Sequence, residues 1–255
     1  MKLSSFRLTW LAAALGLAAL AAPLSACADP NVLWNIVHGQ CAPNEAGKGD
    51  PSPCLAVDLK GGFAVLKDRS GATQVLLIPT DRVTGIEDPA VVAPAAPNYF
   101  ADAWYARRFV NAMAGEVIPR DLLSLAVNSM YGRSQNQLHI HVDCIRPDVR
   151  AALKANQEHI GPVWAPIDVG VSGRRYEAMR VSSGDLAAKN PFRLLADGDP
   201  AARADMGLET LLAWPTSFAD GTAGFVLLAD RASAGDAGSA EELQDHTCKV
   251  LQPAG

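Results

Sequence analysis

The sequence predicts an α+β fold, in which a central antiparallel sheet is flanked by helices. Short apolar runs joined by turn-forming residues predict strand hairpins, the first formed by residues 63–67 and 74–79 around "DRSGAT". A helix from Asn98 to about Met113 follows, because Asn98 can cap a helix and apolar residues then recur at helical spacing. Hairpins separated by helices favour the α+β class.

A second hairpin is predicted from residues 122–128 and 137–144, which are joined by "SMYGRS". Pro147 suits the first turn of a helix that comes next. Later strands are expected at 174–181, 208–214 and 224–229, helical segments near 184–206 and 239–250, and a surface loop at 43–53. Because the later elements loosely repeat the earlier order, a degenerate duplication is a further hypothesis, although no residue repeat is visible.

The first residues have the layout of a secretory signal peptide. Lys2 and Arg7 are positive, residues 8–23 are almost wholly apolar, and small residues follow. The alternative is a spanning anchor, but the apolar run is slightly short for the roughly 20 residues that a bilayer requires. "LSAC" at 24–27 resembles the bacterial lipobox, which implies a lipoprotein signal peptide over residues 1–26 and a lipidated Cys27. We therefore expect a protein of the bacterial cell envelope, anchored to a membrane and facing the periplasm.

Composition excludes some classes of function. The net charge is −5, the pI is near 5.5, and clusters of Lys and Arg are missing, which argues against nucleic-acid binding. Beyond Cys27 an even number of cysteines remains, which in an exported chain predicts two disulfides: Cys41, Cys54, Cys144 and Cys248. Three pairings are open; Cys41–Cys54 would close a local loop, and Cys144–Cys248 would tie the C-terminus to the centre. A structural zinc site is not favoured, because no pair has the close spacing that such sites use.

The stretch "QNQLHIHVDC", residues 135–144, alternates polar and apolar residues, and in a strand these point to opposite faces. We expect one face to be buried against helices and the other to be wet. The buried face would carry Leu138, Ile140, Val142 and Cys144, and the wet face Gln137, His139, His141 and Asp143.

Two of the five histidines of the chain therefore share one face of one strand. The plain interpretation is a pair of exposed or hydrogen-bonded side chains. A second is a metal site of His139, His141 and Asp143, since imidazole and carboxylate suit zinc or iron. A third is covalent catalysis, because a neutral imidazole can attack phosphorus.

The longer segment "VNSMYGRSQNQLHIHV", residues 127–142, resembles the signature of the histidine triad superfamily in the spacing of its Asn, Gln and His residues. The resemblance implies that His141 is the nucleophile and that His139 supports it. It also implies that Gln135 and Asn136 bind the phosphate through hydrogen bonds. Asn128 would position the nucleotide and the imidazole of the nucleophile.

This chain departs from the superfamily at the third triad position, which is Asp143. A carboxylate there would repel phosphate unless it pairs with an imidazole or an arginine, so leaving-group protonation would come from elsewhere or from a protonated Asp143. A shifted register, with Gln137, His139 and His141 as the triad and His139 as nucleophile, breaks the spacing to Asn128. "VLLIPTDRV", residues 75–83, resembles an earlier strand of the superfamily and leaves Lys67 and Arg82 as possible phosphate contacts.

Several motifs together resemble the CDP-diacylglycerol pyrophosphatase family of bacteria, over roughly residues 31–250: "DPSPC", "FAVLKDRSG", "QNQLHIHVDCIRPDVR" and "EELQDHTC". The resemblance implies hydrolysis of CDP-diacylglycerol to CMP and phosphatidate at a membrane surface, as part of phospholipid metabolism. It implies a histidine-triad-like catalytic core over 31–160 and a C-terminal α/β extension over 161–255, packed on the same domain, with a degenerate second half as a hypothesis.

No cofactor is needed for a histidine nucleophile, although a divalent cation could accompany the pyrophosphate. Two other functions remain open at this point. One is a metal-dependent phosphoesterase that uses His139, His141 and Asp143. The other is a non-catalytic envelope lipoprotein that binds a nucleotide or a lipid. The sequence leaves the base preference and the oligomeric state open.

Overall fold

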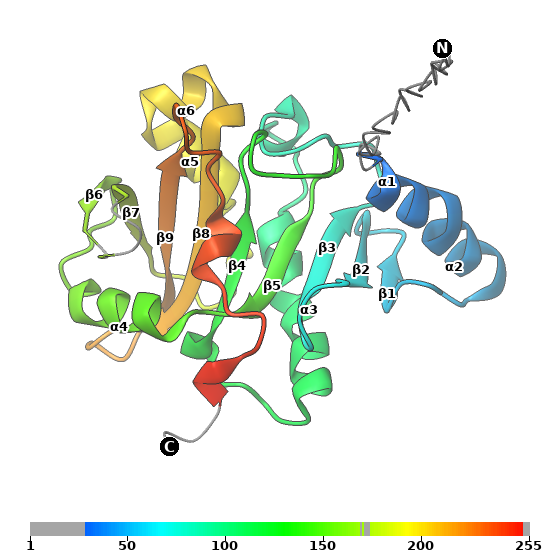
Figure 1. The fold of residues 1–255 in the computed structure, drawn as a ribbon, viewed down its shortest axis with the longest axis horizontal. Helices are drawn as coiled ribbons and strands as arrows, with labels where there is room; N and C mark the ends of the chain where they lie inside the picture. Colours follow the sequence, from blue (N-terminus) through cyan, green and yellow to red (C-terminus); the bar gives the residue numbers. More distant parts are fainter. Residues whose placement is uncertain (1–28, 169, 171–173, 252–255) are drawn as a thin grey trace, which may run out of the picture.

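A computed structural model describes residues 29–168, 170 and 174–251 of the chain. Nine strands in this part form one antiparallel sheet in the order β1-β2-β3-β5-β4-β8-β9-β7-β6, with helices around it (Figure 1). The predicted α+β class with a large antiparallel sheet is confirmed. The expected signal peptide and Cys27 lie outside the described residues.

The strands are β1 (Ala56–Asp58), β2 (Phe63–Lys67), β3 (Val75–Pro79), β4 (Leu123–Val127), β5 (Ile140–Cys144), β6 (Ala165–Ile167), β7 (Tyr176–Val181), β8 (Glu209–Ser217) and β9 (Ala223–Arg231). The α-helices are α1 (Val32–Ile36), α2 (Ala42–Lys48), α3 (Tyr99–Ala114), α4 (Pro147–Asn156), α5 (Pro191–Gly198) and α6 (Pro200–Ala204). A π-helical turn, η1 (Val37–Cys41), joins α1 to α2, and the 3-10 helices are η2 (Pro89–Val91), η3 (Arg120–Leu122), η4 (Met206–Leu208), η5 (Ala240–Leu243) and η6 (Lys249–Leu251).

The helix ends follow local capping chemistry. Helix α3 begins after Asn98, whose side-chain oxygen accepts a hydrogen bond from the N–H of Ala101, and it ends at Gly115, where φ is 76°. Helix α4 begins at Pro147, as predicted, because proline fits the first turn. Over the described residues, no helix is long and apolar enough to cross a membrane.

Helices cover the two faces of the sheet differently. Helices α3 and α5 pack on one face, in a core that extends across both halves of the sheet. On the opposite face, α1 and η1 cover β2 and β3, whereas α4 covers β8 and β9. The segment that contains η5, drawn in red, passes in front of β4 and β8 (Figure 1). The middle of the sheet is therefore buried on both sides.

The sheet has the same strand order on either side of its central pair. At the centre β4 pairs with β8, and Ala126 lies opposite Leu212. Outward from this pair come β5, β3 and β2 on one side, and β9, β7 and β6 on the other. Along the chain each half consists of two strands, one or two helices and two more strands, and β1 is an additional edge strand of the first half.

Three local expectations were wrong. The segment 43–53 is not all loop, because α2 continues to Lys48 and has Pro43 in its first turn. The segment 239–250 contains only the short 3-10 helices η5 and η6. Strand β5 starts at Ile140 and not at Gln137, because the Gln137 side chain donates to the carbonyl oxygens of Pro79 and Asp81 at 3.0 and 2.8 Å.

Both predicted disulfides are present, and the structure selects one of the three pairings. Cys41 bonds to Cys54, which ties η1 to the segment before β1. Cys144 bonds to Cys248 across a sequence separation of 104, which ties the C-terminal segment to the end of β5. The second bond thus holds residues distant in the sequence against the central strand.

Candidate active site

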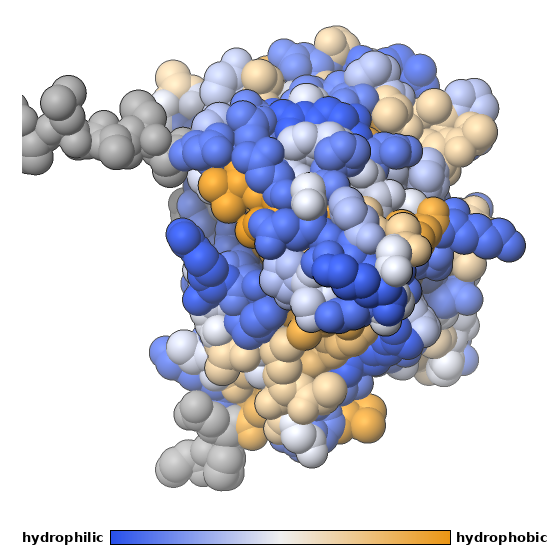
Figure 2. All heavy atoms as spheres, turned by 90° about the vertical axis from the view of Figure 1, so that its right-hand side faces the viewer, coloured by the Kyte–Doolittle hydropathy of each residue, from blue (hydrophilic) through white to orange (hydrophobic). Residues whose placement is uncertain are grey.

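A cavity of about 490 Å³ opens beside the central strands, near α1. Its polar end is lined by Lys67, Asp68, Asn128, Arg133, Gln135, His139, His141 and Glu241. The side of the molecule that carries α1 and α2 faces the viewer in Figure 2, where small apolar patches interrupt a largely polar surface. The cavity brings together four of the residues that the sequence assigned to catalysis and nucleotide positioning: Asn128, Gln135, His139 and His141.

His141 lies in the middle of the sheet, opposite Ala126 of β4 and Leu76 of β3. The prediction that its face of the strand is wet was wrong, because His141 is only 4% exposed and His139 only 8%. Segments that the strand pattern could not reveal, among them η5, cover this face. The two imidazoles nevertheless line the cavity, so they are buried at the floor of an open pocket.

The two ring nitrogens of His141 have different surroundings. Nδ1 lies 2.6 Å from the side-chain nitrogen of Gln74, 3.3 Å from a carboxylate oxygen of Glu241 and 4.0 Å from Asp68. Nε2 is buried and has no hydrogen-bond partner among the residues described. Nε2 is therefore the ring nitrogen that no described residue occupies.

His139 packs against His141, with ring centroids 4.9 Å apart and the rings edge to face. Its Nδ1 donates to the carbonyl oxygen of Gln137 at 2.7 Å, which fixes the proton on that nitrogen. Burial lowers the pKa of His139, and burial followed by the neighbouring His139 lowers the pKa of His141. Both rings are thus held neutral near pH 7, the form that a nucleophile requires.

Gln135, Asn128 and Lys67 line the cavity in different ways. Gln135 accepts from the N–H of Leu33 at 3.1 Å and donates to the carbonyl oxygen of Asp29, so it joins the start of the described chain to the turn before β5. Asn128 bonds to Glu241 and not to His141. Lys67 donates to carbonyl oxygens of the 68–71 turn, which places its cation at the cavity edge.

Three other residues that the sequence singled out do not line the cavity. Asn136 is exposed, and its backbone N–H donates to Pro30. Arg82 donates to Asn31 and lies over the ring of Trp34. Asp143 is fully buried behind the histidines, where it accepts from Thr73 at 3.1 Å.

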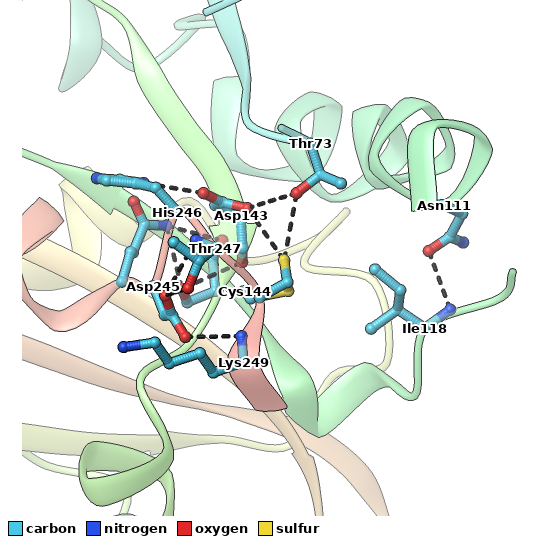
Figure 3. The surroundings of a disulfide bond; sticks show 12 residues. Thr73, Asn111, Ile118, Asp143, Cys144, Asp245, His246, Thr247 and Lys249 are labelled. Atoms are coloured by element: carbon cyan, nitrogen blue, oxygen red, sulfur yellow. Dashed lines mark hydrogen bonds and ion pairs between the residues drawn. A yellow bond between two sulfur atoms is a disulfide. The ribbon is translucent and has the colours of Figure 1, made fainter. Parts of the chain in front are cut away.

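Asp143 also pairs with an imidazole. The sequence analysis expected such a pair, or one with an arginine, because an unpaired carboxylate would repel phosphate. Its carboxylate lies 2.9 Å from Nδ1 of His246, and Figure 3 shows His246 and Thr73 on either side of it, next to the Cys144–Cys248 disulfide. The hydrogen bonds to Asp143 and then to Glu241 raise the pKa of His246 to about 10. His246 is therefore a cation at neutral pH.

Sequence reasoning missed several residues at this site, chiefly Glu241, His246, Gln74, Asp68 and Arg133. Burial alone would raise the pKa of Glu241, but the hydrogen bond from His246 and those from the amides of Gln74 and Asn128 together lower it. Arg133 makes a two-pronged ion pair with Glu87, at 2.6 Å for each bond. The available signal was the motif "EELQDHTC", which contributes both Glu241 and His246.

The geometry also bears on the metal hypothesis. His139, His141 and Asp143 do not form a ligand set in the described ranges, because the Asp143 carboxylate points to Thr73 and His246. A different trio, Asp68, His141 and Glu241, places one ligand atom each within 4.8 Å of the others. The carboxylate of Glu241 is already occupied by hydrogen bonds from Asn128 and Gln74.

Comparison with known proteins identifies the family of the chain. The family model described as CDP-diacylglycerol pyrophosphatase matches residues 28–252. A CDP-diacylglycerol pyrophosphatase of Yersinia pestis is 45% identical over 225 residues, which cover 88% of this chain and 86% of the relative. The matches define the class of the protein as an enzyme, a hydrolase. The chain belongs to the CDP-diacylglycerol pyrophosphatase family, which confirms the family predicted from its motifs.

The raised pKa of His246 predicts how stability depends on pH. A group whose pKa rises from about 6.5 in the unfolded chain to about 10 in the fold stabilises the fold fully below pH 6.5. That contribution is lost as the pH rises through 10. Urea unfolding of the wild type and of His246→Gln should therefore show a large difference in free energy at pH 6 that shrinks by pH 10.5.

The matched control is His159→Gln, which changes an exposed histidine after α4. Its effect on the free energy of unfolding should be small at both pH values. A His246→Gln penalty that is the same at pH 6 and pH 10.5 would contradict the charge assignment.

Proposed function

We propose that this enzyme hydrolyses CDP-diacylglycerol to CMP and phosphatidate through a nucleotidyl-histidine intermediate on His141. The observation that carries the proposal is His141, which lines the cavity and whose buried Nε2 atom has no partner among the described residues. A bare imidazole nitrogen beside cationic and amide side chains suits attack on a phosphate. The family name and the Yersinia relative support this substrate.

The reaction proceeds in two displacements. Nε2 of His141 attacks the phosphorus next to cytidine, the bond to the bridging oxygen breaks, and phosphatidate leaves with that electron pair. This leaving group needs no proton first, because a phosphate monoester is stable as an anion near neutral pH. Water then adds to the phosphorus, and the P–N bond breaks with its electron pair returning to Nε2. One water proton stays on CMP and the other passes to solvent, so His141 is again neutral.

Neutral and cationic donors surround the place where the phosphates bind in this proposal. Gln135 offers an amide and Lys67 offers positive charge, whereas Arg133 is already paired with Glu87. The carboxylates of Asp68 and Glu241 line the same cavity. Amides stabilise developing oxygen charge without titrating, and a cation offsets part of the negative charge of the pyrophosphate. His139 packs on the nucleophile and keeps it in place.

The lipid half of the substrate is placed against the apolar side chains of the cavity. We call these side chains the apolar wall, and its residues are Val32, Leu33, Ile36, Pro53, Leu66 and Leu76. Asp29, where the described chain begins, also lines the cavity, and the sequence before it contains the apolar run 8–23. The wall and the apolar N-terminal run would thus both meet a membrane surface that holds the substrate.

The cellular setting is proposed from the sequence. A lipoprotein signal peptide over residues 1–26 with a lipidated Cys27 would anchor the enzyme in the bacterial cell envelope, facing the periplasm. The two disulfides support an oxidising compartment. A tethered enzyme would meet its lipid substrate in the plane of the membrane.

We also propose that the fold is histidine-triad-like and that residues 161–255 are a degenerate second half. The support is the strand order, which is the same outward from the β4–β8 pair on both sides. The helices between the strand pairs, α3 and α5, also pack on the same face of the sheet. Duplication of one unit explains this order with a single event.

Replacing the nucleophile tests the chemistry. His141→Ala should reduce turnover of CDP-diacylglycerol by at least roughly 10⁴-fold, because the variant lacks the nitrogen that attacks phosphorus in the proposed mechanism. Circular dichroism should show an unchanged fold. His159→Ala, at an exposed position, is the matched control and should keep wild-type turnover.

Chelation separates this mechanism from metal-dependent hydrolysis. The proposal requires no cofactor for the nucleophile, so most activity should survive prolonged incubation with excess EDTA. Normal turnover by His141→Ala, or complete loss on chelation that added metal restores, would refute the histidine mechanism.

A charge on the apolar wall tests where the lipid binds. Val32→Glu, at a residue 41% exposed on α1, should raise KM for long-chain CDP-diacylglycerol in vesicles by roughly tenfold, since burying a valine contributes about 1.5–3 kcal/mol. KM for a short-chain, water-soluble CDP-diacylglycerol should change little. Val117→Glu, on an exposed valine in the loop after α3, is the control. Equal effects of Val32→Glu on both substrates would argue against the wall as a lipid site.

A further inference from the structure

One carboxylate in the site contacts two imidazoles. Oε1 of Glu241 lies 3.3 Å from Nδ1 of His141 and 3.4 Å from Nε2 of His246. Its second oxygen, Oε2, accepts from the side-chain amide of Asn128 at 3.2 Å. Glu241 therefore connects the nucleophile of the proposed mechanism to a second histidine that does not line the cavity.

The position of Glu241 is fixed from several sides. The oxygen of the Asn128 side chain accepts from the backbone N–H of Glu241 at 3.0 Å and from the hydroxyl of Ser239 at 3.2 Å. Asn128 thus forms hydrogen bonds to both the backbone and the side chain of Glu241. Because Asn128 directly follows β4, the carboxylate is held against the central sheet.

His246 sits between two acids. Its Nδ1 lies 2.9 Å from Asp143, and its Nε2 contacts Glu241. The Cys144–Cys248 bond fixes the backbone two residues after His246 to the end of β5 (Figure 3). The cation of His246 thus lies between two acidic side chains and is stabilised by both.

The location of the proton on neutral His141 decides whether it can act as a nucleophile. A proton on Nε2 would be a buried donor without a partner in the described structure, at a cost of about 1–3 kcal/mol. A proton on Nδ1 has the carboxylate of Glu241 as its acceptor, 3.3 Å away. It requires the side-chain nitrogen of Gln74, a donor that lies 2.6 Å from Nδ1, to turn aside. A proton on Nδ1 leaves the electron pair of Nε2 free.

We propose that Glu241 is the positioning residue that holds the proton of His141 on Nδ1, and that Asn128 and His246 hold Glu241 in place. The proposal rests on His141 being the nucleophile. When Nε2 bonds to phosphorus, the ring becomes cationic while Nδ1 keeps its proton, and the negative charge of Glu241 offsets it. When water breaks the P–N bond, the electron pair returns to Nε2 and the Nδ1 proton has not moved.

The role of Glu241 explains how the site can function with Asp143, and not a histidine, at the third triad position. Asp143 does not face the cavity and has no contact with His141 in the described contacts. It acts through His246, which in turn contacts Glu241. The side chain that meets the nucleophile thus comes from the C-terminal segment, which the motif "EELQDHTC" carries.

Glu241→Gln tests the proposal, because it removes the charge and keeps the size. We expect kcat to fall by roughly 10²- to 10⁴-fold with KM little changed, as for loss of an orienting carboxylate behind a catalytic histidine. Glu241→Asp keeps the charge and should recover part of kcat. Glu242→Gln, at the next residue, whose side chain is half exposed, is the matched control and should keep wild-type kcat.

A spectroscopic measurement separates positioning from general loss of structure. The chain has five histidines, so ¹⁵N NMR of histidine-labelled protein can assign His141 by its absence from His141→Ala. In the wild type the neutral ring should carry its proton on Nδ1, and in Glu241→Gln the Nε2–H form should gain population. Glu241→Asp should keep the Nδ1–H form.

The results for the His141 and Glu241 variants test the role of Glu241 separately from the role of His141 as the nucleophile. If His141→Ala keeps normal turnover, the nucleophile itself is wrong. If His141→Ala is inactive but Glu241→Gln keeps wild-type kcat, or loses kcat with the Nδ1–H form unchanged, the role of Glu241 is overturned and the nucleophile stands.

Discussion

The polar face of β5 is buried in the middle of the sheet, and the site depends on this constraint. A polar group without a partner in such a place costs about 1–3 kcal/mol, so nearly every one is paired. Gln137 donates to two carbonyl groups, His139 to a third, and Asp143 bonds to Thr73 and His246. Nε2 of His141 has no partner among the described residues, as also holds for the side-chain oxygens of Gln74, Gln137 and Gln244. Of these residues only His141 lines the cavity, where the proposal places a substrate phosphate.

The rest of the fold maintains this arrangement. The C-terminal segment crosses the buried face and brings Glu241 and His246 to the nucleophile, and the Cys144–Cys248 bond keeps it there. The two halves of the sheet differ at the corresponding point. His141 lies opposite Ala126 in one half, whereas Leu228 lies opposite Leu212 in the other. Leu228 packs with Val149 and Leu153 of α4, so an apolar core fills the place where the first half has its cavity.

Much of the fold could be predicted from local patterns. The hairpins, the Asn98 cap and the proline start of α4 are short-range signals, and the structure has them where the sequence placed them. The burial of His141 could not be predicted, because alternation in a strand shows that two faces differ and not what covers each face. The cover comes from residues about one hundred positions later in the chain.

The candidate site, like the fold, could be predicted in part from local sequence patterns. Asn128, Gln135, His139 and His141 lie within one hairpin, and their spacing brought them to one cavity. Asn136 and Arg82 were chosen by position alone and lie outside it, because the turn before β5 and the segment after β3 direct them elsewhere. Gln74 belongs to no motif, and the motif "EELQDHTC" contains Glu241 and His246 without indicating their roles. Each of the three reaches His141 or Asp143 only through tertiary contacts.

The most direct test of the account is capture of the covalent intermediate. CDP-diacylglycerol labelled in the cytidine moiety would be mixed with excess enzyme and quenched within milliseconds in alkaline denaturant, which preserves a P–N bond. Fragmentation mass spectrometry of the peptide that spans β5 should then place one cytidylyl group on His141. Product that accumulates with no labelled protein at any quench time, or a label on His139, would contradict the central claim.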